Sequence, residues 1–447
     1  MTNEVTVSED FSNYNINGTD IRYIFAPGHT GSGGNAPAIS VTAQSSGIEV
    51  IIQNMLTTTS SYGIESAAAG TLIQVDQSGN IDGSQGVHLL GDDQVVVNNG
   101  TFDNSFVGIR VDASGANITN NGSITAPFAF SIADGTEDTM VTNNGEIHVA
   151  TMVAFVEGND VTFKLGQNSV ITVDDGGLGF ALNSTNATDI AHVTNAGSIT
   201  APTVVQGGNG REIVKNTGTI DGDIQLGGGD DAFDNSTGIF TGTVDGGTGN
   251  DVYTLGSAAI RIVDGADGGT DTVRSASSVS LSSSAFSGVE IENITLLARN
   301  NVKAFGNQLD NVISGNSGNN TLKGLEGFDT LRGGKGRDHL YGGTDADTFI
   351  FKTGDSGKTH TSADTIYDFT DPDSIDLTGW DANSKKHGIQ DFDFIGTHAF
   401  SGHAGQLHVV RADSDTWIEG DTNGDKKPDF VIHLDDAVTI KAGNFDL

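Results

Sequence analysis

Apolar and polar residues alternate in short runs through the first half of the chain, and many runs break at asparagine followed by glycine. Examples are QVVVNNGTF from Gln94, NITNNGSITA from Asn117 and MVTNNGEIHVA from Met140. Alternation indicates strands with one buried face, because successive side chains of a strand point to opposite faces. Asparagine and glycine both tolerate the positive φ of a tight turn. The pattern therefore predicts many short strands joined by turns.

The turns recur at a nearly constant distance along the chain. Gly79, Gly100, Gly122 and Gly145 are separated by steps of 21, 22 and 23 residues. A strand, a turn and another strand in each step predict a parallel β-helix over residues 46–225, with coils stacked about 4.8 Å apart. A meander of hairpins is the alternative, since asparagine–glycine is also a hairpin turn. Residues 1–45 are interpreted as an N-terminal cap.

Between residues 226 and 305 the step persists while the turns become acidic and rich in glycine. The phrases are LGGGDDAFD from Leu226, GGTGNDVYT from Gly246 and ADGGTDTVR from Ala266. Their aspartates are 20 residues apart, and they are candidates for a ladder of metal ligands: Asp231, Asp251 and Asp271.

From Gly306 the repeat shortens to nine residues, and five units follow one another up to residue 350. The eighth position of each unit is apolar, and the sixth position carries an acid or its amide: Asn311, Asn320, Asp329, Asp338 and Asp347. Residues 351–447 lose the repeat and are interpreted as a compact C-terminal β cap, because a solenoid needs its exposed edge covered.

The nine-residue spacing predicts an all-oxygen metal site. Six residues form a turn and three a strand, so two units make one coil and every second unit lies on the same side. Carboxylates from stacked turns, together with turn carbonyls, offer the 6–8 oxygens that Ca²⁺ prefers. We expect Asp329 with Asp347 to form the strongest site. Asn320 with Asp338 has one charge fewer, as does Asn311 with Asp329 at the edge of the array.

The unit resembles the RTX nonapeptide, glycine-glycine-x-glycine-x-aspartate-x-apolar-x, which binds calcium in a β-roll. The resemblance implies that turn carbonyls complete each site. For the first site these belong to Gly324, Glu326, Gly343 and Asp345, and for the second to Gly315, Ser317, Gly334 and Gly336.

Residues 351–447 resemble the C-terminal region of serralysin-type proteins, on phrases such as ADTIYDFTDPDSIDLTGWDAN. This resemblance implies that Asp364 and Asp368 help to close the last site, although ordinary turn acids would explain them equally well. It also implies type I secretion with the signal in the last stretch, since the ending NFDL is similar to such tails. The chain would then fold on release into a calcium-rich medium.

The composition of the chain limits the classes of partner that it can bind. The chain has 58 acids against 21 bases, a net charge of −37, which repels nucleic acid and anionic lipid. It has no cysteine, which excludes disulfides and thiolate metal sites. No apolar run is long enough for a membrane span, and the first residues do not form a Sec-type signal. Several calcium ions are the expected cofactors.

No enzyme motif stands out. The sequence contains no His-Glu-x-x-His and no Gly-x-Ser-x-Gly, and residues 1–225 hold only five Lys and Arg. We therefore favour a secreted, non-catalytic surface, matrix or adhesion protein, with a cell-surface or extracellular glycan as a possible partner. The alternative is a polysaccharide-active β-helix enzyme: a glycoside hydrolase, for which acids such as Asp112 and Asp174 are available, or a lyase or epimerase. Asp421–Asp429 resembles an EF-hand loop without its last ligand, and a plain turn is the competing interpretation.

Overall fold

The computed structural model describes residues 3–256, 260–265, 269–286 and 290–447. Its described residues form β-strands and two short 3-10 helices, η1 (Ser284–Phe286) and η2 (Ala442–Asn444). The prediction of an all-β fold is therefore confirmed. The chain divides into two compact units, Met1–Asp251 and Val252–Leu447, and each is described by itself. None of the helices in the described part of the chain has the length and apolar character needed to cross a bilayer.

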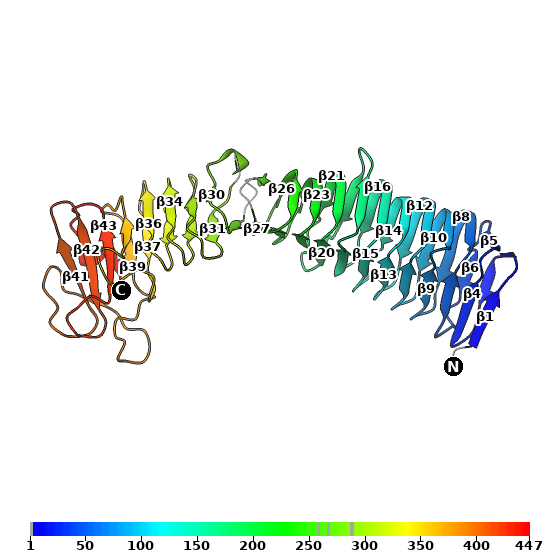
Figure 1. Cartoon of the computed structure of the whole chain (residues 1–447), viewed down its shortest axis with the longest axis horizontal. Helices are drawn as coiled ribbons and strands as arrows, with labels where there is room; N and C mark the ends of the chain where they lie inside the picture. Colours follow the sequence, from blue (N-terminus) through cyan, green and yellow to red (C-terminus); the bar gives the residue numbers. More distant parts are fainter. Residues whose placement is uncertain (1–2, 257–259, 266–268, 287–289) are drawn as a thin grey trace. The chain divides into compact units, whose positions relative to one another are not determined.

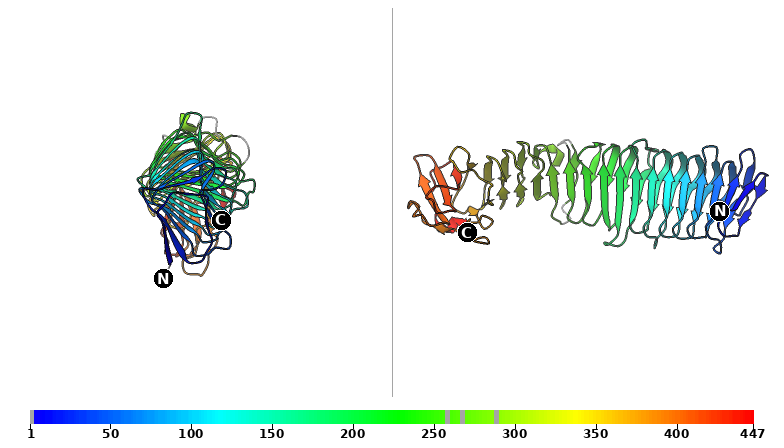
Figure 2. Two further views of the ribbon diagram at one scale, coloured as in Figure 1. Left: turned by 90° about the vertical axis from the view of Figure 1, so that its right-hand side faces the viewer. Right: turned by 60° about the horizontal axis from the view of Figure 1, so that its bottom comes forward.

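The first unit is a parallel solenoid with two sheets, whose strands lie side by side in chain order (Figures 1 and 2). Its first sheet is made of short strands, and every pair with a given register is parallel. These strands are β1 (Asn3–Val7), β4 (Ile21–Phe25), β7 (Glu49–Ile52), β9 (Leu72–Val75), β11 (Val95–Asn98), β13 (Asn117–Asn120), β15 (Met140–Asn143), β17 (Val161–Leu165), β20 (Ile190–Asn195), β22 (Arg211–Asn216) and β24 (Ala232–Asn235).

The second sheet of this unit contains longer strands, again in parallel pairs. They are β2 (Phe11–Ser12), β3 (Tyr14–Ile16), β5 (Thr30–Gly33), β6 (Ile39–Val41), β8 (Met55–Ser66), β10 (Asn80–Leu89), β12 (Thr101–Val111), β14 (Ser123–Ile132), β16 (Glu146–Val156), β18 (Val170–Val173), β19 (Leu178–Leu182), β21 (Ser198–Gln206), β23 (Thr219–Gln225), β25 (Ile239–Thr241) and β26 (Thr243–Asp245). Parallel pairing between strands one coil apart confirms the β-helix and rejects the meander of hairpins.

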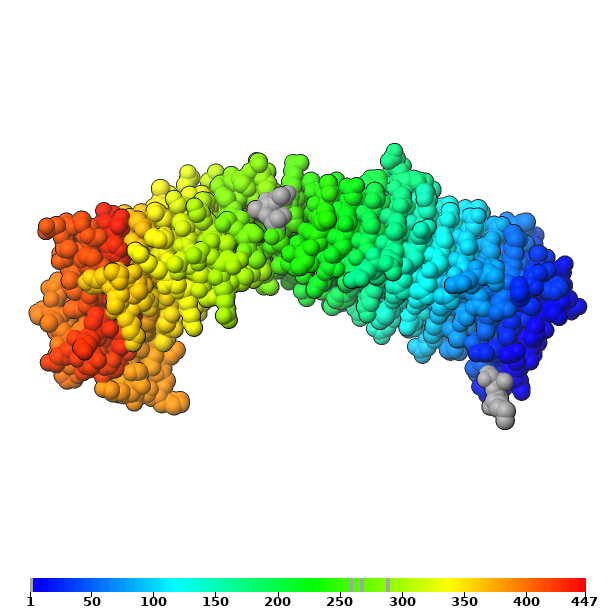
Figure 3. All heavy atoms as spheres, in the orientation of Figure 1, coloured from blue at the N-terminus to red at the C-terminus, as the bar shows by residue number. Residues whose placement is uncertain are grey.

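Alternation along the strands builds the core of the first unit. Ile118 of β13 lies in register with Val96 on one side and Val141 on the other, and all three are fully buried. In the second sheet, Ile124 is in register with Phe102 and Ile147 in the same way. Each coil thus adds one residue to each inward column, and the coils appear as successive bands in Figure 3. One coil alone would leave these columns exposed, so stability depends on stacking.

Buried asparagines form a hydrogen-bonded ladder at the corner that follows the first sheet. The Nδ2 of Asn98 donates to Oδ1 of Asn120 at 2.7 Å, and Asn120 donates in turn to Asn143 at 2.7 Å. The ladder appears again at Asn195, which donates to Asn216 at 2.9 Å. The first asparagine of each Asn-Asn-Gly phrase is therefore an interior residue as well as a turn former, because its amide satisfies the rungs above and below.

Replacing Asn120 with Ala should destabilise the first unit, since it leaves buried partners on two neighbouring coils without a hydrogen bond. The expected loss is about 2–3 kcal/mol of unfolding free energy, measured by denaturant melts in saturating calcium. Asn121→Ala is the matched control: Asn121 makes a similar chain of amide contacts, to Asn99 and Asn144 at 2.9 Å each, but on the exposed surface. A loss for Asn120→Ala no larger than for Asn121→Ala would contradict a structural role for the buried ladder.

The second unit also has two sheets, and its strands alternate between them. One sheet holds β27 (Val252–Leu255), β29 (Thr272–Ser275), β31 (Asn293–Leu296), β33 (Val312–Ser314), β35 (Thr330–Arg332), β37 (Thr348–Ile350), β39 (Ser374–Asp376) and β44 (Phe445–Asp446). The other holds β30 (Val279–Ser280), β32 (Lys303–Phe305), β34 (Thr321–Leu325), β36 (His339–Gly343), β38 (Asp364–Ile366), β43 (Phe430–Leu434), β42 (Thr416–Asp421), β41 (Gln406–Arg411) and β40 (Asp393–Phe394). The short strand β28 (Arg261–Ile262) also belongs to this unit.

Register in the second unit follows the predicted coil of two nine-residue repeats. Leu331 of β35 pairs with Ile313 and with Phe349, which are 18 residues before and after it. Leu322 and Leu340 pair in the opposite sheet, and these apolar residues of the eighth position are fully buried. Each repeat therefore stacks on the repeat two positions before it, as the spacing predicted.

The last strands close the end of this unit. β43 continues the parallel sheet by pairing Leu434 with Ile366, and β41, β42 and β43 then pair antiparallel. Trp380 packs on Phe430 with ring centroids 4.1 Å apart, and both side chains are buried. The change to antiparallel strands ends the stack of coils.

Candidate metal centre

The turns of the three repeats with aspartate at the sixth position share an unusual backbone. Their second and fourth positions have positive φ, for example 86° at Gly334 and 137° at Gly336, and 121° at Gly343 and 77° at Asp345. The repeats that begin at Gly306 and Gly315 show no positive φ among their residues. Glycine is favoured here because an L side chain rarely adopts these angles. The turn conformation thus separates the aspartate repeats from the asparagine repeats.

One column of side chains lies at the edge of the sheet that contains β33, β35, β37 and β39. The backbone N–H of Asn311 donates to Oδ1 of Asp329 at 2.8 Å, and the N–H of Asp329 donates to Oδ1 of Asp347 at 2.9 Å. The N–H of Asp347 donates to Asp373 at 3.0 Å. Asp329 and Asp347 are therefore stacked one rung apart, as the nine-residue spacing requires.

A second column lies at the edge of the other sheet. The N–H of Asn320 donates to Oδ1 of Asp338 at 2.7 Å, and the N–H of Asp338 donates to Oδ1 of Asp364 at 2.8 Å. Asp364 is thus the next rung of this column. Asp368 lies outside both columns and accepts a hydrogen bond from the N–H of Gly342 at 2.9 Å.

Sequence reasoning missed Asp373, which stands before β39 as Asp347 stands before β37. The signal was weak because 26 residues separate these two rungs, so a search at nine-residue spacing does not reach Asp373. Its Oδ2 accepts from the N–H of Thr370 at 2.7 Å, which leaves this carboxylate satisfied by the protein. Asp373 therefore ends its column.

The second carboxylate oxygens of three other column acids have no such hydrogen bond. Oδ2 of Asp329, Asp338 and Asp364 is buried and has no hydrogen-bond partner among the described residues. A buried carboxylate oxygen without a partner is costly, and burial of its charge costs more. Carboxylate oxygens are ligands that Ca²⁺ favours, so the donor set fits this ion.

Burial also shifts the protonation of these acids. It raises the pKa of Asp329, Asp338 and Asp347 to about 7 and that of Asp364 to about 9. Neighbouring acids add to the effect: Asp347 acts on Asp329, and Asp338 acts on Asp364. Without a cation, these carboxyl groups therefore keep protons up to a pH near their raised pKa values.

The amides of Asn311 and Asn320 are hydrogen-bonded to the backbone on both sides. Asn311 donates through Nδ2 to the carbonyl of Glu292 at 3.2 Å, and Asn320 donates to the carbonyl of Asn300 at 3.3 Å. Their Oδ1 atoms accept from the N–H groups of Asn307 and Asn316, at 2.8 Å each. The amides complete their rungs without charge. A ligand role for Asn311, Asn320, Gly315 and Ser317 stays a prediction.

The first unit contains a third column. The N–H of Glu212 donates to Oδ1 of Asp231 at 2.7 Å, and the N–H of Asp231 donates to Asp251 at 2.8 Å. Burial raises the pKa of Glu212 to about 7 and that of Asp231 to about 8. Oε2 of Glu212 and Oδ2 of Asp231 are buried without a hydrogen-bond partner in the described residues. Glycines with positive φ precede the two aspartates, at Gly227, Gly229, Gly247 and Gly249.

Glu212 was also missed, although its signal is present. The phrase GGNGREIVK from Gly207 has the nine-residue spacing with glutamate in place of aspartate at the sixth position. Asp271 lies in the second unit, where its N–H donates to Oε2 of Glu292 at 2.8 Å. Of the expected ladder, Asp231 and Asp251 belong to the first unit and Asp271 to the second, and the ladder stays a prediction. Residues 266–268, which begin the third phrase, lie outside the described residues.

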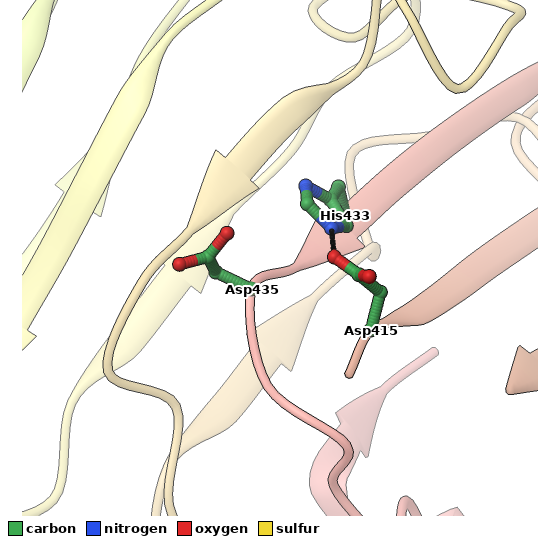
Figure 4. Close-up of side chains that lie close together, drawn as sticks. All are labelled: Asp415, His433 and Asp435. Atoms are coloured by element: carbon green, nitrogen blue, oxygen red, sulfur yellow. Dashed lines mark hydrogen bonds and ion pairs between the residues drawn. The ribbon is translucent and has the colours of Figure 1, made fainter. Parts of the chain in front are cut away.

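Two other clusters of polar side chains in the second unit have hydrogen-bond partners within the protein. In the Asp421–Asp429 turn, Asp421 accepts from the N–H groups of Gly424 and Lys426 at 2.6 and 2.9 Å, which supports the plain-turn interpretation. Figure 4 shows His433 bonded to Asp415 at 2.8 Å with Asp435 close by. The other ring nitrogen of His433 contacts the hydroxyl of Thr365 at 3.2 Å, so both ring nitrogens have partners within the protein.

Comparison with known families agrees with the geometry of the second unit. A family model for the RTX calcium-binding nonapeptide repeat matches residues 305–327 and 314–349, with 4 copies. Residues 305–349 are RTX calcium-binding repeats. These RTX repeats include Asp329, Asp338 and Asp347 of the two columns. The serralysin-type resemblance of residues 351–447 remains a resemblance.

No curated protein matches the chain. Among solved structures, the chain is similar to the solution structure of the AlgE6R3 subunit from the Azotobacter vinelandii mannuronan C5-epimerase. The identity is 28%, the match covers 34% of this chain and 82% of that one, and the TM-score is 0.26. At this TM-score the superposition carries no argument.

The raised pKa values predict how the calcium-free protein responds to pH. Asp329, Asp338 and Asp347 titrate near 7 when folded against an ordinary value of 3.8, so the folded state binds more protons than the unfolded chain between these values. Stability in chelator should therefore fall as pH rises from about 5.5 to 7.5. Thermal melts at both pH values measure this, and the double variant Asp329→Asn/Asp338→Asn should show a smaller difference. A melting temperature in chelator that rises over this range would contradict the raised pKa values of the buried column acids.

Proposed function

We propose that the chain is a secreted, calcium-binding RTX protein that folds on binding calcium and acts without catalysis at an extracellular surface or matrix, as in adhesion. The observation that carries the proposal is the pair of stacked acid columns, in which Oδ2 of Asp329, Asp338 and Asp364 is buried without a partner among the described residues. RTX repeats are typical of secreted proteins, which supports an extracellular site of action. Export by type I secretion is part of the same proposal.

Electrostatics supports a link between calcium and folding. The net charge of −37 opposes compaction, and the columns place several acids one rung apart. Calcium would neutralise the columns where it is abundant, whereas a low-calcium cytosol would leave the acids to repel one another. Because the stacked rungs exist only in the folded state, the free energy of calcium binding becomes free energy of folding.

The proposed ligands come from successive rungs. Asp329 and Asp347 supply carboxylates to one site, with the turn carbonyls of Gly324, Glu326, Gly343 and Asp345. Asp338 and Asp364 supply another, with Gly334 and Gly336 in the turn. A further site would lie between Glu212, Asp231 and Asp251 in the first unit.

Calcium titration tests the proposal. Saturating calcium at about 100 times Kd should stabilise the protein by about 2.7 kcal/mol per site, which thermal melts and circular dichroism would show. Asp329→Asn should weaken binding at its site, because it removes a charged ligand and lets an amide satisfy the rung as Asn311 does. Asp413→Asn is the matched control, since it makes the same change of charge at an exposed acid outside the columns.

Equal calcium affinity and equal calcium-induced stabilisation in the wild type, Asp329→Asn and Asp413→Asn would argue against the column sites. An unchanged melt in chelator would remove calcium as a folding ligand altogether.

A polysaccharide-active enzyme is the second candidate, favoured by one group on the outward face of the first unit. His88 contacts Asp112 at 2.7 Å and faces Glu65 at 3.4 Å, which joins an imidazole to two carboxylates. Such a group could transfer protons to or from a sugar. Asp174, the other acid considered above, is paired with His148 at 3.1 Å.

We expect no release of reducing ends, and no unsaturated products, when calcium-saturated protein is incubated with neutral and acidic polysaccharides. Release that is lost in Asp112→Asn but kept in Asp174→Asn would replace the non-catalytic function with the enzymatic one.

A further inference from the structure

Two rows of side chains run across the coils of the second sheet in the first unit. Register places Gln85 beside Tyr62 on one neighbouring strand and Val107 on the other, and Val107 is in turn beside Phe128. The second row lies three residues further along the strands. It contains Glu65, His88, Arg110 and Ser131, again in register. A first row with aromatic rings at Tyr62 and Phe128 therefore runs beside a second, polar row.

β-bulges shape the space beside the first row. The register of β10 with β12 shifts between Gly83 and Gln85, and that of β12 with β14 shifts between Asp103 and Val107. The extra residues of β12 lift Phe106 out of the sheet, where it is 53% exposed. Bulges often re-aim a side chain next to a functional site. Phe106 meets Phe128 edge to face, with ring centroids 5.7 Å apart.

These residues line an open groove of about 310 Å³. Four aromatic side chains line it, together with amide, hydroxyl and guanidinium groups. One of the rings, Tyr62, is fixed by stacking on His88 at a centroid distance of 4.4 Å. The residues that matter most are Tyr62, Gln85, Phe106, Arg110, Phe128 and Phe155. A concave site with apolar faces and a few polar groups is the usual form of a ligand site.

Charge decides which ligands fit this groove. The Nε of Arg110 donates to both carboxylate oxygens of Asp112 at 3.0 Å, so the one cation in the lining is already paired. Asp112 also contacts His88, which faces Glu65 on its other side. The surroundings are therefore acidic, and an anionic ligand would be repelled. A neutral ligand meets no such penalty.

We propose that this groove binds a neutral polysaccharide lying along the axis of the first unit. The apolar faces of its sugar rings pack on Phe106, Phe128 and Tyr62. Its hydroxyls bond to Arg110 of the polar row and to Gln85 of the first row. A polymer fits because the rows repeat at every coil, about 4.8 Å apart, which is comparable to the length of one sugar in an extended chain. The proposal goes beyond calcium binding and uses no residue of the acid columns.

A purely apolar partner fits the same surface less well. An acyl chain or the apolar face of a second copy would cover Arg110, Gln85 and Ser131 without offering them hydrogen bonds. Burying polar groups in this way costs about 1–3 kcal/mol each. Sugar hydroxyls satisfy these groups while the ring faces cover the aromatics.

Affinity electrophoresis of the full chain in saturating calcium tests the proposal. Native gels would contain hydroxyethyl cellulose as a soluble neutral β-linked glucan, and parallel gels would contain alginate as an anionic polysaccharide. The variants are Phe106→Ser and Arg110→Gln, which alter one ring and one polar group of the groove. Ile239→Ser in β25 is the matched control, because it removes an apolar side chain that is 65% exposed and does not line the groove.

We expect hydroxyethyl cellulose to retard the wild type and Ile239→Ser equally, with about tenfold weaker retardation for Phe106→Ser and a smaller loss for Arg110→Gln. Retardation by alginate alone, absence of retardation, or equal retardation of Phe106→Ser and Ile239→Ser would overturn the proposal. Sedimentation velocity separates the remaining case, since a dimer lost in Phe106→Ser would identify the groove as a self-association surface. Calcium titration of the same variants should be unchanged, so failure here is distinct from failure of the column sites.

Discussion

Each unit of this solenoid must satisfy the polar groups that its own stacked turns bury, and most of its other features follow from this constraint. One oxygen of each column acid accepts a backbone N–H from the neighbouring rung, so rung spacing fixes where the acid lies. In Asp329, Asp338 and Asp364 the other oxygen is then held inside without a partner among the described residues. A proton or a divalent ion can complete it, and only the ion leaves the acids charged at neutral pH.

The chain contains two solutions to this problem. In the corner ladder of the first unit, amide groups such as those of Asn98 and Asn120 act as donor and acceptor at once, so each rung is complete without charge. In the columns, aspartate can only accept when ionised, so two stacked aspartates need something between them. Asn311 and Asn320 apply the first solution at the start of the RTX columns. The choice between asparagine and aspartate thus decides whether a rung is complete without a proton or a cation.

Much of this could be predicted from the sequence, because a fixed period converts directly into register. The 18-residue pairing of Leu331 with Phe349 follows from nine-residue units in pairs. What could not be predicted depends on contacts that break the period. Asp373 is separated from its rung by a loop, Glu212 replaces the expected aspartate, and the two asparagines turn their amides toward backbone carbonyls. The bulges that expose Phe106 leave no periodic signal either, since the coil length already varies by a residue or two.

The two proposed functions use different coils of the chain. The coils that carry the groove are completed by the asparagine ladder, and their acids at Asp112 and Glu65 lie on the outward face, where His88 and Arg110 pair with them. The acid columns begin only at Glu212, beyond the strands that form the groove. Recognition would then use a surface whose own coils need no ion, whereas the later coils, with buried acids on successive rungs, would respond to calcium. A ligand that binds the groove and an ion that binds the columns therefore act on different residues, and any coupling between them must pass through the stability of the stacked coils rather than through a shared contact.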